Sequence, residues 1–170
     1  MADEILENEI LSKKDLIDYD IERSYYRVCK LIRKYKRLKC KSFGEPQLTI
    51  TTKYKYVFVD EKTIGINDYT KLDQYIDDDT EYKKMSRKIV FATENMSPEE
   101  LVYYTVCLYN GKSEYRCTQE IGCSADGLIP IKKSCIIKFA CVFDIEVYND
   151  DKFGEDEEAD FQDFIEKFKL

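Results

Sequence analysis

The residues in this chain best suited to chemistry are cations, and the chemistry they suit is the binding of anions. Nine Lys and Arg residues, and no Asp or Glu, lie between residues 23 and 41. Further cationic candidates are Lys112, Arg116, Lys132 and Lys133. Because DNA carries a dense row of phosphates, clusters of Lys and Arg are what binding to its backbone requires. The long basic run could equally be a solvated helix face, and both interpretations stay open.

The residue types and motifs that enzymes commonly use for catalysis are largely absent. The chain has no His, the commonest general base and the commonest metal ligand. It contains no G-x-S-x-G or phosphate-loop motif, so we expect no enzyme, no catalytic residue and no cofactor. Four of the seven Cys residues, at positions 117, 123, 135 and 141, lack the close pairing of structural zinc sites. We therefore expect no metal site and treat these thiols as small buried apolar groups.

Charge is distributed unevenly along the 170 residues, whose net charge is −7. Residues 1–20 hold seven acidic residues against two basic ones, and residues 150–170 hold nine against three. Two acidic ends thus bracket the basic run. No apolar run approaches the length of a membrane span, and "MADEILENEI" lacks the basic-then-apolar pattern of a signal peptide. These features, with an odd number of Cys, predict a cytoplasmic protein without disulfides.

Hydrophobic periodicity predicts a mainly α-helical chain whose first helix covers residues 15–39. Its apolar residues recur at steps of three and four, so one face can pack while the opposite, cationic face stays solvated. Gly and Pro in "SFGEPQ" end this helix, and the β-branched and aromatic run at 49–59 predicts a strand. That strand could belong to a small β-hairpin inserted near 49–66. Helices are also expected at 69–76 and 81–92.

The clearest helix in the sequence is "SPEELVYYTVCLYNG", residues 97–111. Ser97 suits the N-cap, Pro98 suits the first helical position, and Glu100 completes a capping box. Asn110-Gly111 supplies a left-handed stop. A helix of this length depends on packing for its stability, so we expect it to dock on the residues that come next in the chain.

Two further helices are expected around a tight turn. Ser113 caps the first, "EYRCTQEI", which ends at Gly122, and Ser124 caps the second. Apolar residues of the second helix, from Leu128 to Phe139, lie at steps suited to one buried face. A lead helix, a supporting helix and a third helix after a glycine turn have the pattern of a helix-turn-helix.

Three stretches resemble the ArpU family of phage-type transcriptional regulators, whose helix-turn-helix is similar to that of sigma factor region 4. They are "KYKRLK" (34–39), "SPEELVYYTVCLYNGKSEYRCTQEIGCS" (97–124) and "IKKSCIIKFACVFDIEVYND" (131–150), of which the last is the most family-specific. The resemblance implies a cytoplasmic protein of a bacterial host, encoded by a prophage or mobile element. Such a protein would bind double-stranded DNA near promoters and control late genes through host RNA polymerase or a sigma factor.

The resemblance also implies roles for individual residues. Ser124 would be the turn serine at the start of the recognition helix, with Lys132 and Lys133 as the basic pair within that helix. Lys112 and Arg116 would contact phosphates from the supporting helix. The candidate DNA-binding residues from the basic run are Arg33, Lys34 and Arg37.

The expected recognition helix departs from the family pattern. Tyrosines and an arginine are typical after the turn, but this chain has "GLIP" at 127–130. A proline deep in a helix deletes a backbone hydrogen bond and costs about 3 kcal/mol, so we expect the helix to restart at Pro130. Residues 124–129 would then form a loop, and the two lysines would lie in the first turn. Without an arginine to read guanine, low-specificity DNA contact is expected.

The C-terminal tail supports an alternative function. Phe161, Phe164, Ile165 and Phe168 recur at helical spacing among acidic residues. Such an amphipathic helix can dock in a groove of RNA polymerase, a sigma factor or another regulator, or it can fold back on its own domain. Under this alternative the protein is an interaction module on a degenerate helix-turn-helix scaffold.

Four parts are expected along the chain. An acidic arm and the basic helix occupy 1–41, an unassigned segment with the hairpin occupies 42–96, the helix-turn-helix domain occupies 97–148, and the acidic tail occupies 149–170. The basic helix should pack on the helix-turn-helix core. A homodimer stays open as well, because helix-turn-helix proteins often pair over two half-sites.

Overall fold

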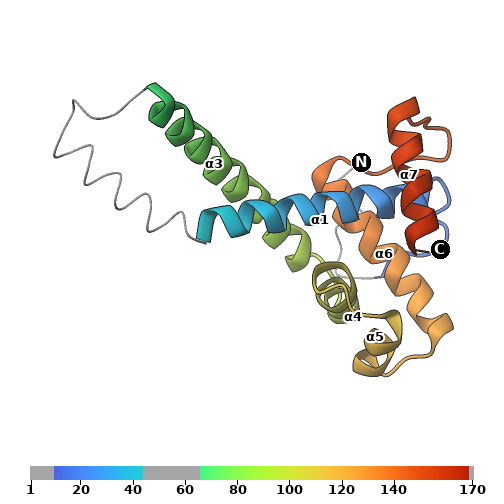
Figure 1. The fold of residues 1–170 in the computed structure, drawn as a ribbon. Coiled ribbons are helices and arrows are strands. Elements are labelled where there is room, and N and C mark those ends of the chain that lie inside the picture. The colour runs from blue at the N-terminus through green and yellow to red at the C-terminus, as the bar shows by residue number, and fades with distance from the viewer. Residues whose placement is uncertain (1–9, 44–65, 169–170) are drawn as a thin grey trace. The chain divides into compact units, whose positions relative to one another are not determined.

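The computed structural model describes the backbone of residues 10–43 and 66–168, with side chains described at 10–41 and 80–167. These residues are mainly helical and contain no strand, which confirms the expected α class (Figure 1). The predicted hairpin falls on residues outside the described ranges, except Ile66, which begins a helix. In chain order the elements are α1 (Ile21–Phe43), α3 (Ile66–Glu94), α4 (Pro98–Tyr103), the π-helix η1 (Tyr104–Tyr109), α5 (Glu114–Ile121), α6 (Ala125–Phe143) and α7 (Glu155–Phe168).

The chain divides into two compact units. The larger unit joins Met1–Ile32 to Ile89–Leu170, and the smaller unit is Arg33–Lys88. Helix α3 covers both stretches that predicted separate helices at 69–76 and 81–92, because no Gly or Pro interrupts the residues between them. Within the described part of the chain, no helix has the length and apolar character needed to cross a membrane.

Helix α1 begins six residues later than predicted. The Asp20 carboxylate accepts a hydrogen bond from the Arg23 backbone N–H at 3.0 Å, which caps the helix there. The backbone of Asp18 and Asp20 forms hydrogen bonds with residues far along the chain instead of helical ones. The Asp20 N–H donates to the Val147 carbonyl at 2.8 Å, and the Asn149 N–H donates to the Asp18 carbonyl at 2.9 Å. The helix predicted from residue 15 was wrong at this end because the segment pairs with residues 147–149.

The helix predicted at 97–111 is confirmed at both ends. The Ser97 hydroxyl accepts from the Glu100 N–H at 3.2 Å, and the Glu100 carboxylate accepts from the Ser97 N–H at 2.7 Å, completing the capping box. At the other end Gly111 adopts a left-handed φ of 64°. The last turns form the π-helix η1, which periodicity did not predict.

The next two helices have the expected caps. The Ser113 hydroxyl accepts from the Arg116 N–H, and α5 ends at Gly122 with a φ of 79°. The Ser124 hydroxyl accepts from the Gly127 N–H at 3.1 Å and begins α6. Only the residues from Gly122 to Ser124 separate the two helices.

Helix α6 does not restart at Pro130, so that prediction was wrong. The helix is continuous from Ala125, and Pro130 is its sixth residue. The missing N–H would have bonded the carbonyl of Asp126, which lies in the exposed first turn where water can take its place. Leu128 and Ile131 are 2% and 6% exposed, and burying them favours an uninterrupted helix. The two lysines therefore lie in the second and third turns instead of the first.

A fully buried ion pair joins α4 to α6 at the centre of the larger unit. Glu100 and Lys138 are both 0% exposed, and the Lys138 Nζ lies 2.9 Å from the Glu100 Oε2. The Ser134 hydroxyl donates to the other carboxylate oxygen, and Lys138 also donates to the Asn95 carbonyl at 3.4 Å. Apolar side chains that are at most 2% exposed complete this core, including Val28, Ile32, Tyr103, Cys117, Leu128, Cys135, Ile136, Ile137, Phe139 and Val147.

Lys138→Met should lower the free energy of unfolding by about 3–5 kcal/mol, because it leaves the buried Glu100 carboxylate without a counter-charge. Urea unfolding followed by circular dichroism measures the loss. The double variant Glu100→Gln/Lys138→Met should recover part of it, since no buried charge remains. As a control, Arg116→Met removes a cation from an exposed pair and should change stability by less than about 1 kcal/mol. A loss in Lys138→Met no larger than in this control contradicts the prediction.

Burial also suppresses the ionisation of two thiols in this unit. It raises the pKa of Cys107 to about 12 and the pKa of Cys141 to about 11. Both side chains are half-buried, whereas Cys40 in α1 is exposed. The reactive form of Cys is the thiolate, so Cys107 and Cys141 are almost wholly in the unreactive form at neutral pH.

Alkylation with iodoacetamide at pH 8 should therefore modify Cys40 well before Cys107 and Cys141. As the pH rises towards 11, the thiolate fractions of the two raised groups grow about tenfold per pH unit, and their modification should accelerate accordingly. Peptide mass spectrometry at several pH values gives the three rates. Equal rates for the three thiols at pH 8 would show that burial does not protect Cys107 and Cys141.

Candidate functional site

The smaller unit carries a concentrated positive surface on two helical stretches, residues 33–41 of α1 and 80–88 of α3. We call these stretches the basic arms. Tyr35 and Tyr82 stack with ring centroids 5.5 Å apart and an interplanar angle of 14°. The Lys34 ammonium and the Glu81 carboxylate form an ion pair beside them. Buried apolar side chains lie on the inner sides of both arms, namely Tyr35, Leu38, Tyr82 and Met85.

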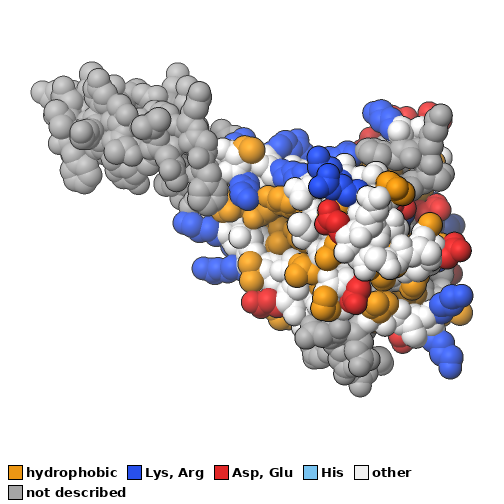
Figure 2. Space-filling model, turned by 90° about the horizontal axis from the view of Figure 1, so that it is seen from below, with side chains coloured by type: hydrophobic (Ala, Val, Ile, Leu, Met, Phe, Trp, Pro, Cys, Tyr) orange, Lys and Arg blue, Asp and Glu red, His pale blue; other side chains and the backbone are white. Residues whose placement is uncertain are grey.

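The charge of the basic arms is almost entirely positive. Their described side chains comprise ten Lys and Arg and one acid, and nine of the ten cations are exposed. Residues 33–88 as a whole hold 14 basic and 9 acidic residues, a net charge of +5, whereas the rest of the chain holds 13 and 25, a net charge of −12. Figure 2 shows one face of the molecule, on which Lys and Arg side chains project from the surface among hydrophobic, uncharged and acidic groups. The predicted residues Arg33, Lys34 and Arg37 all lie exposed in this surface.

An aromatic cluster holds α7 against the first half of α1 (Figure 1). Tyr26, Phe161 and Phe164 are 4–5% exposed, and the Tyr26 ring centroid lies 5.7 Å from that of Phe161 and 5.4 Å from that of Phe164. Ile165 packs against the same cluster, whereas the Phe168 side chain lies outside the described residues. The apolar side of this acidic helix is thus packed on its own chain, which is one of the two arrangements that the sequence left open.

Ion pairs surround the aromatic contact between α7 and α1. The Arg27 guanidinium binds both carboxylate oxygens of Glu157, at 2.9 and 3.1 Å. Arg23 pairs with Glu158 at 3.0 Å, and the remaining pair, Lys30 with Asp160, is 3.4 Å apart and largely exposed. The expectation of a solvated cationic face was therefore wrong for Arg23 and Arg27, whose side chains are 25% and 31% exposed, whereas Lys30 is exposed as expected.

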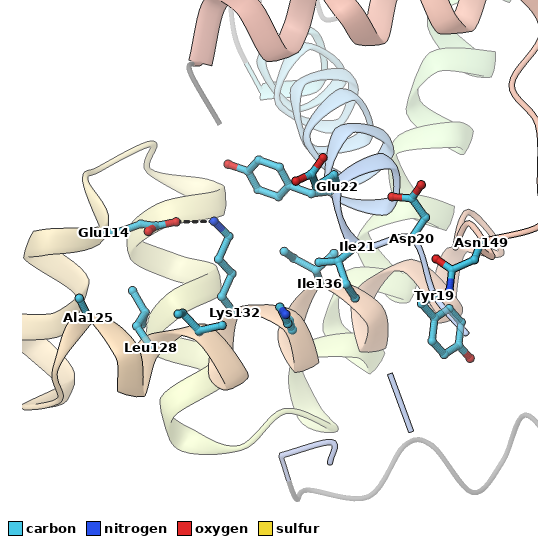
Figure 3. Close-up of a pocket in the computed structure, with 13 residues that line it drawn as sticks. Tyr19, Asp20, Ile21, Glu22, Glu114, Ala125, Leu128, Lys132, Ile136 and Asn149 are labelled. Atoms are coloured by element: carbon cyan, nitrogen blue, oxygen red, sulfur yellow. Dashed lines mark hydrogen bonds and ion pairs between the residues drawn. The ribbon is translucent and has the colours of Figure 1, made fainter. Parts of the chain in front are cut away.

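A groove of about 530 Å³ runs beside the first half of α6, within the larger unit (Figure 3). Its walls come from α6, from the start of α1, from the first residue of α5, and from Asn149. Ile129 is 47% exposed, and Figure 3 shows Lys132 reaching from α6 towards Glu114. The other lining residues are Tyr19, Asp20, Ile21, Glu22, Tyr25, Ala125, Leu128, Lys133 and Ile136.

The lining of this groove contains both positive and negative side chains, two of which form an ion pair. The Lys132 Nζ lies 2.6 Å from a Glu114 carboxylate oxygen and 5.4 Å from the centroid of the Tyr25 ring. Burial raises the pKa of Tyr25 above its usual range, so this phenol stays neutral. Asp20 and Glu22 add two further carboxylates to the lining. With three acids against two lysines, the groove is poorly suited to phosphate.

The remaining predicted residues lie along α5 and α6 without forming one positive surface. Lys112 is exposed before α5, and Arg116 is exposed but pairs with Glu120 at 3.2 Å. Ser124 caps α6, so its hydroxyl is engaged by the backbone. Lys133 is exposed, in contrast to its neighbour in the ion pair described above.

Sequence reasoning missed two sets of contacts. The buried pair joins residues 38 positions apart, and the available signal was that Ser134 and Lys138 share the helix side that buries Cys135. The second set is the pairing of α7 with α1. Its signal was complementary spacing, with cations at 23, 27 and 30 and acids at 157, 158 and 160.

Neither a protein-family model, nor a curated protein, nor a solved structure was found to match this chain. Among the residues that the structure describes, no group of three or more Cys, Asp or Glu is placed to hold a metal ion. The function therefore has to be inferred from the charges and contacts of the chain itself.

Phe161→Ala should lower the free energy of unfolding by about 3–5 kcal/mol, because it empties a buried aromatic site. Glu157→Gln should lower it by less than about 1 kcal/mol, since the ion pair is partly solvated. Urea unfolding of both variants beside the parent protein measures the difference. A larger loss in Glu157→Gln than in Phe161→Ala would show that charge, and not apolar contact, holds α7 in place.

Proposed function

We propose that this protein is a DNA-binding transcriptional regulator that holds the DNA backbone through its basic arms. The observation that carries the proposal is their charge, ten cations against one acid in the described side chains, nine of the cations being exposed. Duplex DNA presents one negative charge per roughly 1.7 Å of its axis, so a surface with many exposed cations can neutralise several phosphates together.

The arrangement of the arms supports binding to a polyanion rather than to a single small anion. The exposed cations are spread along two helical stretches, while Tyr35 and Tyr82 hold those stretches together. Cations fixed on rigid helices lose less freedom when they bind than cations on a loose segment, which favours affinity. The negative charge of the rest of the chain opposes non-specific adhesion to DNA, so contact is favoured at the arms.

The resemblance to ArpU family regulators supports a role in transcription. Under this proposal α4 with η1 is the lead helix, α5 the supporting helix and α6 the recognition helix of a helix-turn-helix. The protein would act near promoters of phage or mobile-element late genes, together with host RNA polymerase. Helix α6 adds little base reading, because Lys132 is paired within the protein and Ile129 and Pro130 occupy its exposed side.

Binding of a fluorescein-labelled random-sequence duplex, measured by anisotropy over a salt series, tests the proposal. Lys84→Ala/Arg87→Ala should weaken binding at low salt at least tenfold and reduce the slope of log K against log salt by about two. The control Lys13→Ala/Lys14→Ala removes two exposed lysines of the larger unit and should leave the slope unchanged. Absence of binding at low salt, or equal weakening in both variants, overturns the proposal.

The groove beside α6 favours a second candidate function, an interaction module that binds RNA polymerase or a sigma factor. Its mixed charge and its exposed Ile129 suit a polypeptide better than a phosphate chain. Ile129→Asp should then weaken binding to purified RNA polymerase while leaving duplex binding unchanged. Co-sedimentation with the polymerase measures this directly, and unchanged co-sedimentation removes the groove from consideration.

A further inference from the structure

We infer that helix α7 is a displaceable competitor that occupies a second DNA-backbone-binding surface on α1. This surface is the side of α1 that carries Arg23, Arg27 and Lys30. The inference rests on the proposed function, to which it adds a regulatory element. It commits to double-stranded DNA as the other occupant, because the contacts that α7 makes are those that phosphates would make.

The contact between Arg27 and Glu157 is the clearest case of this equivalence. The Arg27 Nε and Nη2 donate to the two carboxylate oxygens of Glu157 at 2.9 and 3.1 Å. The same planar fork binds two oxygens of a phosphate with the same geometry. Glu157 therefore occupies the position that a backbone phosphate would take.

The other two cations of this surface each meet one carboxylate of α7 and also have a partner outside it, Asp20 for Arg23 at 3.7 Å and the Tyr26 hydroxyl for Lys30 at 3.3 Å. An Nη of Arg23 lies 3.0 Å from a Glu158 oxygen, and the Lys30 Nζ lies 3.4 Å from an Asp160 oxygen. Three successive cations of one helix thus meet three carboxylates of another, a row of negative charge along a cationic helix. Such a row is what a DNA strand offers.

The spacing of these three cations places them on one side of the first part of α1. Arg23, Arg27 and Lys30 follow steps of four and three along the helix. Residues at these steps share one side of a helix. Removing α7 would therefore take one carboxylate away from each of three cations on this side of the helix.

The contact is also suited to exchange. The carboxylates and cations are accessible to solvent at its edge, where the side chains of Lys30 and Asp160 are 61% and 63% exposed. Ions and phosphates can reach such pairs and replace them one at a time. The apolar part of the contact comprises Tyr26, Phe161 and Phe164, with Tyr25, Cys29, Phe153 and Ile165 packed against them, and it is what the incoming DNA has to displace.

The test neutralises the competing charges without touching the aromatic cluster. In the full chain, Glu157→Gln/Glu158→Gln/Asp160→Asn should bind the labelled random-sequence duplex at least tenfold more tightly than the parent at low salt. Its plot of log K against log salt should be steeper, because more phosphates are then contacted.

A matched variant separates position from total charge. Glu155→Gln/Asp156→Asn/Asp163→Asn removes three exposed acids of the same helix that form none of the three ion pairs with α1. It changes net charge equally and should raise affinity much less. Circular dichroism should show that both variants keep the helical content of the parent.

Hydrogen exchange supplies a second measurement on the unaltered protein. If DNA displaces α7, the backbone amides of residues 158–167 should exchange faster in the presence of the duplex than in its absence. A role for α7 that is only structural predicts no such change. Unchanged exchange in a saturated complex overturns the inference.

The outcomes separate the inference from the function on which it rests. If the parent binds DNA through the basic arms but the two triple variants bind equally well, the inference fails and the proposed function stands. If the first triple variant binds and the parent does not, α7 is a competitor, and the proposal that the basic arms hold DNA in the unaltered protein fails. If none of these proteins binds DNA at low salt, both proposals fail.

Discussion

A single buried carboxylate sets the conditions for the larger unit. Glu100 is fully enclosed, and an enclosed charge must be matched by a partner and by hydrogen bonds. Its carboxylate accepts hydrogen bonds from the Ser97 backbone N–H at the start of α4 and from Ser134 and Lys138 of α6. Because the three donors fit only one placement of α4 on α6, the register of these helices is specified by polar geometry as well as by apolar packing. The π-helix η1 and helix α5 follow directly from α4, and their positions depend on that placement.

Charge outside this core differs between the two units. The larger unit has a net charge of −12 and the smaller unit a net charge of +5. Where the two signs meet inside the larger unit, on α1 and α7, they are paired with each other. A protein with this pattern can bind a polyanion at one location and repel it elsewhere. The overall net charge of −7 conceals this division.

The sequence was a good guide wherever the deciding interaction is local. Ser97, Ser113, Gly122 and Ser124 mark helix ends correctly, because a cap is satisfied by residues three or four positions away. It was a poor guide to the start of α1, because hydrogen bonds between Asp20 and a segment more than a hundred residues away keep the preceding residues out of the helix. At Pro130 the local penalty is real, but burial of the flanking apolar residues outweighs it. The same distinction applies to the candidate site. Composition identified the basic run, but the long-range contacts that cover some of its cations with α7 could not be predicted from it.

The pairing of the segment before α1 with the segment after α6 has a consequence for how the chain is made. Tyr19 stacks on Tyr148 at 5.0 Å, and the Val147 backbone N–H donates to the buried Ser24 hydroxyl. A ribosome delivers these partners far apart in time, so the start of α1 must wait, without its final neighbours, until most of the chain has emerged. Contacts of such long sequence separation slow folding. The residues of the smaller unit are all synthesised during that interval.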